Sequence, residues 1–151
     1  MYCYKYPHPA VTADCIVFNQ EEDMISVLLI KRKNEPFKDC WAFPGGFINM
    51  EESAEDAAKR ELKEETGLEV SKVEQLKAYS NPDRDPRERI ITIAFIAESK
   101  IKDVKGGDDA KEARWFDISN LPSLAFDHEQ ILTDSLNKLK NPNLSADHKN
   151  C

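Results

Sequence analysis

The segment GGFINMEESAEDAAKRELKEETGL, residues Gly45 to Leu68, decides the fold of this chain. Its second part has the spacing of an amphipathic helix, which we place at residues 52–66 because Gly67 is a typical helix terminator. Projected at about 100° per residue, one side of this helix carries small and apolar residues, at Ala54, Ala57, Ala58 and Leu62. We expect this side to pack on a sheet, whereas the opposite side, which is rich in charged residues, faces solvent.

Three glutamates continue the inward side of this helix, at Glu61, Glu64 and Glu65. Neighbouring like charges repel one another, and the negative end of the helix dipole disfavours each anion by roughly 0.3–1 kcal/mol. A divalent cation relieves both costs, and clustered carboxylate oxygens suit Mg²⁺ or Mn²⁺. The plainer interpretation is a solvated acidic face that pairs with Arg60 and Lys63. That interpretation leaves unexplained why the acids share a side with the alanines.

The rest of the chain predicts strands around this helix and one further helix. Alternating apolar residues indicate strands at 10–18, 25–31, 41–43, 73–79, 89–98 and 113–116. Residues 124–139 have the spacing of a second amphipathic helix, and a polar loop spans 99–111. Strands mixed with two helices indicate a sheet that is covered on both faces.

Composition and charge limit the classes of partner. The 151 residues fit one domain, and the net charge of −7 argues against a nucleic-acid partner while allowing a small phosphorylated ligand held with a cation. No apolar run approaches the ~20 residues that span a bilayer, and residues 1–9 lack the features of a signal peptide. The four cysteines form no C-x-x-C pair. We therefore expect a cytoplasmic protein with reduced thiols and no membrane partner.

Gly46, Glu52 and the run from Arg60 to Leu68, RELKEETGL, have the residue types and spacing of the Nudix box. The chain thus resembles the Nudix hydrolases. The resemblance implies an α/β (α+β) fold, a Nudix-like α/β/α sandwich with a mixed β-sheet between helices. It also implies a single Nudix domain at 1–140. The polar composition of 141–151 indicates a flexible tail.

The resemblance assigns a metal site and a reaction. Glu61, Glu64 and Glu65 would ligate Mg²⁺, with Mn²⁺ as an alternative, and the Gly45 carbonyl would be a further ligand. Glu52 would make an outer metal contact. The metal would neutralise phosphate oxygens and activate the water that attacks one phosphorus of a diphosphate.

Two further catalytic roles follow from the same resemblance. Arg60 would orient the glutamates through charge-assisted hydrogen bonds. A general base often comes from a later loop in this family, and the candidates are Asp108, Asp109 and Glu112. The sequence does not choose among these three acids.

The segment SNPDRDPR, residues 80–87, is the best indication of the substrate. Arg84 and Arg87, in a turn stiffened by proline, are candidates to hold a phosphate or a terminal ribose. The plainer interpretation pairs these arginines with Asp83 and Asp85 at the surface. The R-D-P-R pattern and the segments 109–116 and 121–128 are similar to a Nudix subgroup that acts on ADP-ribose. The resemblance therefore implies hydrolysis of ADP-ribose to AMP and ribose 5-phosphate.

Other residues are weighed for contact with the same ligand. Arg32 ends a strand and is a candidate to contact phosphate, and Gly46 lets the backbone approach a ligand closely. Phe37 is a candidate to stack on adenine. For Trp41 we expect core packing, and for His128 a packing or capping role.

Two alternatives to an ADP-ribose hydrolase stay open. The first is a Nudix hydrolase of a nucleoside triphosphate, dinucleotide or nucleotide sugar. The second is a non-catalytic nucleotide sensor, because the subgroup resembles the sensor domain of transcriptional regulators. Those regulators carry a C-terminal DNA-binding domain, whereas about a dozen residues follow the second helix here. We expect a small-molecule nucleotide as the partner and consider a homodimer, which is common in the family.

Overall fold

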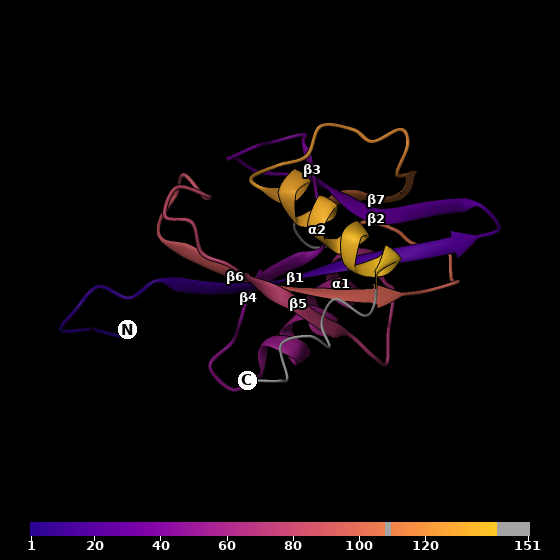
Figure 1. Cartoon of the computed structure of the whole chain (residues 1–151). Helices are drawn as coiled ribbons and strands as arrows, with labels where there is room; N and C mark the ends of the chain where they lie inside the picture. The colour runs from indigo at the N-terminus through magenta and orange to yellow at the C-terminus, as the bar shows by residue number, and fades with distance from the viewer. Residues whose placement is uncertain (108–109, 142–151) are drawn as a thin grey trace.

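The computed structural model describes residues 1–107 and 110–141 (Figure 1). In this part of the chain seven strands and two helices follow one another: β1 (Ala10–Glu21), β2 (Met24–Arg32), β3 (Trp41–Ala42), β4 (Gly45–Phe47), α1 (Ala54–Thr66), β5 (Glu74–Tyr79), β6 (Ile90–Glu98), β7 (Ala110–Asp117) and α2 (His128–Lys140). None of the helices described is long and apolar enough to cross a membrane.

Strand β1 is the centre of one mixed sheet. It pairs in parallel with β6 and antiparallel with β2 and β4. Strand β5 extends the sheet beyond β6, and β3 and β7 both pair antiparallel with β2. The mixed sheet expected from the sequence is therefore confirmed.

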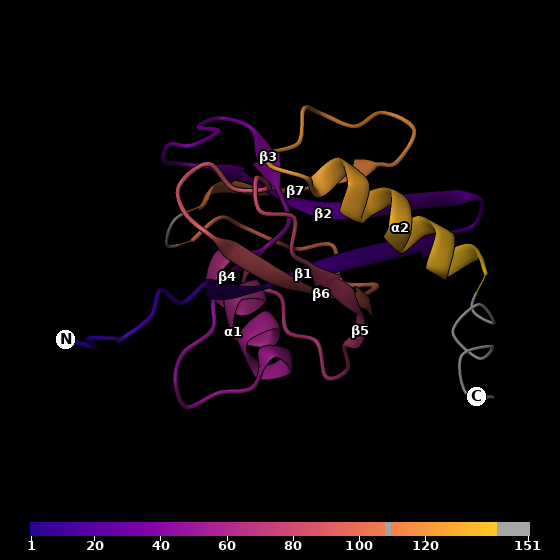
Figure 2. The ribbon, with the colours of Figure 1, turned by 60° about the vertical axis from the view of Figure 1, so that its left-hand side comes forward.

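Two hydrophobic cores lie on opposite faces of this sheet. Val17 of β1 packs in the core that Leu62 of α1 enters. The next residue, Phe18, packs in the core that Ile131 of α2 enters, because successive strand side chains point to opposite faces. Helices α1 and α2 accordingly cover opposite faces of the sheet (Figure 2). The predicted α/β/α sandwich is confirmed.

Local capping sets the ends of α1. The hydroxyl of Ser53 accepts a hydrogen bond from the backbone N–H of Asp56 at 3.1 Å, so the helix begins at Ala54 rather than at Glu52. At the other end Gly67 has φ 77° and donates its N–H to the Lys63 carbonyl. This left-handed conformation favours glycine and ends the helix where the sequence predicted.

The second helix begins later than predicted, at His128 instead of Leu124. The backbone before it is held by Trp41, which donates its N–H to the Ser123 carbonyl and accepts from the Ala125 N–H. Leu124 therefore makes a β-bridge with Trp41 and cannot join the helix.

The strands also differ from the prediction in length and number. Strand β4, formed by Gly45, Gly46 and Phe47, was not predicted, and β7 starts at Ala110 instead of Ala113. Two glycines and one aromatic residue show no alternation of apolar and polar residues. Strand β4 is therefore recognised only from its pairing with β1. Residues 108–109 and residues 142–151 of the predicted tail lie outside the described residues.

Candidate active site

A cavity of about 500 Å³ opens between the sheet, the start of α2 and the loop before β6. Its walls carry acidic side chains from α1 and β1 and basic side chains from β2 and the 80–89 loop. The polar and aromatic residues on which the site depends are Asp14, Arg32, Gly45, Gly46, Glu61, Glu65, Arg84, Arg87, Phe126 and His128.

The glycine turn is fixed directly against the last turns of α1. The N–H of Gly45 donates to Glu65 Oε2 at 3.2 Å, and Glu65 is buried. A Cβ added to Gly46 would lie 2.6 Å from the carboxyl carbon of Glu61. Only a residue without a side chain allows this approach, so the two glycines position both carboxylates on one wall of the cavity.

Glu61 is the half-buried acid of this wall. Burial raises the pKa of its carboxyl, and the neighbouring guanidinium of Arg60 opposes that shift. Arg60 Nη1 donates to Glu61 Oε1 at 2.8 Å. A carboxylate that is partly removed from water and faces a cavity is stabilised by a cation placed there.

Arg60 joins three glutamates of the box. Besides Glu61, it donates to Glu64 Oε2 at 3.2 Å and to Glu52 Oε2 at 2.9 Å. The Arg60 guanidinium, followed by the Asn49 backbone N–H, lowers the pKa of Glu52 to about 2. The structure therefore contains the contacts through which Arg60 was expected to orient the glutamates.

Two of the predicted metal ligands lie outside the cavity wall. The side chain of Glu64 is 42% exposed, which corrects the expectation that it shares the inward side of α1. It follows Arg60 by four residues and lies on that side of the helix, whereas Glu65 turns inward. Glu52 precedes the helix and pairs with Arg60, so it does not line the cavity.

The carboxylates on the wall fit Mg²⁺ in the mode that this ion prefers. Among residues 1–107 and 110–141, no three acidic, histidine or cysteine side chains converge into a preformed metal site. Mg²⁺, however, commonly keeps several waters and is held by one or two carboxylates together with substrate phosphates. Glu61 and Glu65, beside the Gly45–Gly46 backbone, are such a pair of hard oxygen donors.

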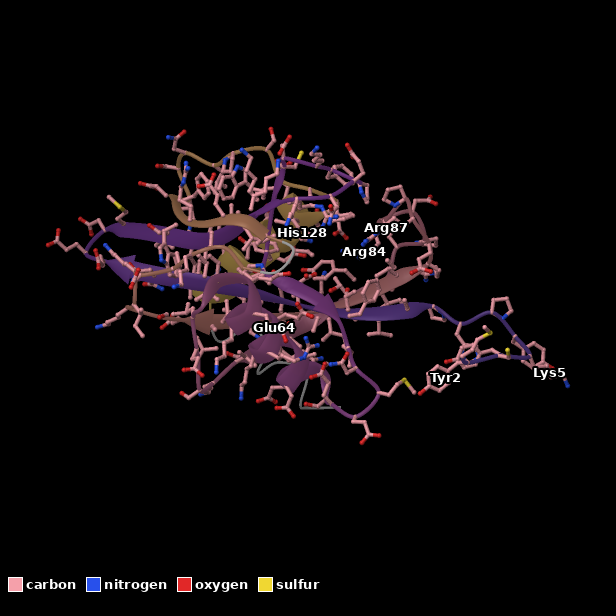
Figure 3. All side chains as sticks on the ribbon, turned by 180° about the vertical axis from the view of Figure 1, so that it is seen from behind. Tyr2, Lys5, Glu64, Arg84, Arg87 and His128 are labelled. Atoms are coloured by element: carbon pink, nitrogen blue, oxygen red, sulfur yellow. The ribbon has the colours of Figure 1, made fainter. Side chains whose placement is uncertain are left out.

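The arginines of the 80–87 segment line the same cavity. Figure 3 shows Arg84, Arg87 and His128 close together, with Glu64 further away on α1. Arg84 donates two hydrogen bonds to Asp127, at 2.9 and 2.7 Å, and its side chain is only 4% exposed. Arg87 pairs with Asp85 at 2.8 Å. The predicted pairing thus holds for Arg87, whereas the partner of Arg84 comes from the start of α2.

Aromatic rings border the basic end of the cavity. Phe126 lines it and lies 4.8 Å, between ring centroids, from Phe37. The guanidinium groups of Arg32 and Arg87 lie 4.9 and 5.6 Å from the Phe126 ring centroid. Phe37 therefore contacts Phe126 but does not itself line the cavity, and Trp41 lies in the core as expected.

Of the three candidates for the general base, Glu112 lies within the described residues. It pairs with Arg114 at 2.9 Å and does not line the cavity. Asp108 and Asp109 lie outside the described residues.

Asp14 is a site residue that the sequence analysis missed. It lies on the buried strand β1, lines the cavity and accepts a hydrogen bond from the Thr92 hydroxyl at 2.6 Å. An acid within the apolar run from Ala10 to Phe18 is costly to bury. That cost was the available signal for a functional role.

One cavity with carboxylates of a helix at one end and arginines at the other suits a phosphorylated ligand held with a divalent cation. The family comparison agrees with this class. The chain belongs to the NUDIX family, because the model of the NUDIX domain matches residues 8–135.

Three relatives illustrate the similarity. The chain is 55% identical over 130 residues to a Methanocaldococcus jannaschii ADP-ribose pyrophosphatase, covering 85% of this chain and 74% of that protein. It is 32% identical over 141 residues to an Acinetobacter baylyi ADPR responsive transcriptional repressor, NtrR, covering 90% of this chain but only 56% of the repressor. The NUDIX domain of Shewanella oneidensis NrtR, solved as a cocrystal with ADP ribose, superposes with a TM-score of 0.83 at 29% identity. That match covers 89% of this chain and 90% of the solved one.

Proposed function

We propose that this protein hydrolyses ADP-ribose to AMP and ribose 5-phosphate with Mg²⁺ as the cofactor. The observation that carries the proposal is the placement of Glu61 and Glu65 in the same cavity as Arg32 and Arg87. An anionic diphosphate needs cationic groups around it, and its hydrolysis needs a site that holds a cation beside the reacting phosphorus. The similarity to the archaeal ADP-ribose pyrophosphatase supports the choice of substrate.

Each group has a role in this proposal. Glu61 and Glu65, with the Gly45 carbonyl, would hold Mg²⁺ or Mn²⁺, and Glu64 and Glu52 would keep Arg60 in place beside them. When bound, the metal lowers the pKa of water and neutralises phosphate oxygens.

The basic end of the cavity would receive the rest of the ligand. Arg32 and Arg87 present guanidinium groups at the cavity wall, and we assign them to the phosphates. Phe126, with Phe37 packed against it, offers a ring for a base or sugar face. We expect a small nucleotide as the partner, and the negative net charge argues against nucleic acid.

A substrate panel tests the proposal. Purified protein with Mg²⁺ would be offered ADP-ribose, nucleoside triphosphates, NADH, diadenosine polyphosphates and nucleotide sugars, and the products would be separated and quantified. We expect ADP-ribose to show the highest kcat/KM and to yield AMP and ribose 5-phosphate in equal amounts. Faster turnover of another member would reject ADP-ribose as the substrate and keep a diphosphate hydrolase.

The similarity to a repressor favours one second candidate, an ADP-ribose sensor without turnover. The two candidates differ in one measurement, because a sensor binds ADP-ribose and leaves it intact. Calorimetric binding without product release in the presence of Mg²⁺ would establish the sensor.

A further inference from the structure

His128 and Asp14 face each other at the inner end of the cavity, where the proposed mechanism does not use them. His128 is the first residue of α2 and is only 4% exposed. Its Nε2 lies 3.8 Å from Asp14 Oδ2, and both residues line the cavity. This separation exceeds a direct hydrogen bond.

The tautomer of His128 is fixed by its other nitrogen. Nδ1 accepts a hydrogen bond from the backbone N–H of Phe43 at 3.1 Å. A ring nitrogen that accepts carries no proton, so the imidazole is neutral and the proton is on Nε2. The ring is also held in place by Phe43, whose ring centroid lies 4.8 Å away with the planes inclined by 24°.

His128 and Asp14 therefore offer one hydrogen-bond donor and one acceptor to a ligand group in the cavity. Nε2–H donates, and the carboxylate of Asp14 accepts. Thr92 already donates to Asp14 Oδ2, so the carboxylate is held in its orientation. A phosphate oxygen could accept from His128, but it would be repelled by the carboxylate, whereas a hydroxyl group can accept from one and donate to the other.

We propose that Asp14 and His128 form a recognition site for a sugar hydroxyl of the substrate and thereby determine specificity. A single hydroxyl oxygen at about 2.8 Å from both groups spans their separation. This inference rests on the proposed function, in which the substrate contains two riboses.

The position of the pair agrees with a ribose beside the diphosphate. A Cβ added to Gly45 would collide with Asp14, and Gly45 in turn donates its N–H to Glu65. Gly45 thus lies between Asp14 of the hydroxyl site and Glu65, one of the carboxylates that we assign to the metal. A ribose joined directly to the reacting phosphates is the part of the substrate that can reach it.

Five deoxy analogues of ADP-ribose, each lacking one free hydroxyl of either ribose, test the inference. The kcat/KM of each analogue would be compared with that of ADP-ribose for the wild type and for His128→Asn. Asparagine keeps an acceptor for the Phe43 N–H and removes the Nε2 donor. His8→Asn, on the exposed N-terminal segment, is the matched control.

For the wild type we expect one analogue to lose at least about tenfold in kcat/KM. In His128→Asn the ratio of kcat/KM for ADP-ribose to kcat/KM for that analogue should fall towards one, while the same ratios for the other four analogues stay unchanged. Asp14→Asn keeps the size of the side chain and should likewise lose the discrimination against that one analogue. It serves as the second variant if His128→Asn unfolds.

The outcomes separate this inference from the proposed function. If the wild type hydrolyses ADP-ribose and gives the same kcat/KM with all five analogues, the hydroxyl site is rejected and the proposed function stands. An equal fall in kcat/KM for ADP-ribose and every analogue in both variants would also reject the hydroxyl site, because a merely structural role of the two residues predicts that result. No hydrolysis of ADP-ribose by the wild type would overturn the proposed function and this inference together.

Discussion

The backbone N–H of Gly45 lies 3.2 Å from Oε2 of Glu65, although twenty residues separate the two in the chain. Strand β4 and the last turns of α1 are joined by this hydrogen bond. Because the donor is a main-chain group, it fixes the carboxylate without neutralising its charge. A buried and oriented carboxylate is what a site for a divalent cation needs.

Glu65→Gln tests this carboxylate. The amide keeps the size of the side chain and can still accept from Gly45, but it loses the charge. We expect kcat for ADP-ribose to fall by about 10²- to 10³-fold, since a lost metal contact removes several kcal/mol of transition-state stabilisation. Steady-state kinetics would measure this loss. Glu55→Gln, on the first turn of the same helix, is the control, and equal activities of the two variants would remove Glu65 from the site.

The two glycines of β4 should respond differently to alanine. In Gly46→Ala the new Cβ meets the end of the Glu61 side chain, which can move, so we expect a large loss of activity and a small change in Tm. In Gly45→Ala it lies 2.6 Å from the backbone carbonyl of Ala13, which cannot move easily, so we expect a loss of stability as well. Thermal melting and kinetics on both variants check this order. Similar Tm losses would contradict it.

Variants of Arg84 and Asp127 distinguish a structural role of Arg84 from a role in ligand binding. Removing either partner leaves a charge in a poorly hydrated place, so Arg84→Ala or Asp127→Ala should cost about 3 kcal/mol in the free energy of unfolding. The double variant Arg84→Met/Asp127→Leu should recover most of that stability. If Arg84 also contacts the ligand, the double variant stays inactive. Recovery of activity together with stability would show that Arg84 is only structural.

The pH dependence of stability reports on His128. Burial lowers the pKa of its imidazole below the ordinary value of 6.5 and outweighs the opposing charges of Asp14 and Asp127. Below pH 6.5 the unfolded state therefore binds a proton that the folded state does not, so stability falls as pH falls, by up to ~1.4 kcal/mol per pH unit.

Chemical unfolding from about pH 5 to about pH 8 measures this effect. His128→Asn should lack that part of the pH dependence, while His8→Asn should retain it. Parallel curves for the wild type and His128→Asn would mean that the pKa of the imidazole is the same in the folded and the unfolded protein.

The sequence predicted those parts of the fold that depend on local pattern. The end of helix α1 was predicted correctly and its start within two residues, because its apolar side and the terminator Gly67 are written in consecutive residues. Strand β4 was missed because its two glycines acquire a partner only when β1 lies beside them. The start of α2 was misplaced because Leu124 has helical spacing but pairs with Trp41, 83 residues earlier.

The site shows the same division. The spacing of the Nudix box predicted that Glu61 and Glu65 share one side of one helix, and both line the cavity. The pairing of Arg84 with Asp127 spans 43 residues and depends on tertiary structure. Asp14 resembled a core position because its strand is apolar, and its neighbours Thr92 and His128 come from other elements.

Hydrolysis in ¹⁸O-labelled water tests the central claim most directly. The protein would be incubated with ADP-ribose and Mg²⁺, and the products would be weighed by mass spectrometry, with an EDTA-treated sample beside it. We expect AMP and ribose 5-phosphate only when Mg²⁺ is present, with one labelled oxygen in the phosphate of one of them. Intact ADP-ribose, products that form equally in EDTA, or a label in a product other than these two phosphates would contradict metal-assisted attack of water on the diphosphate.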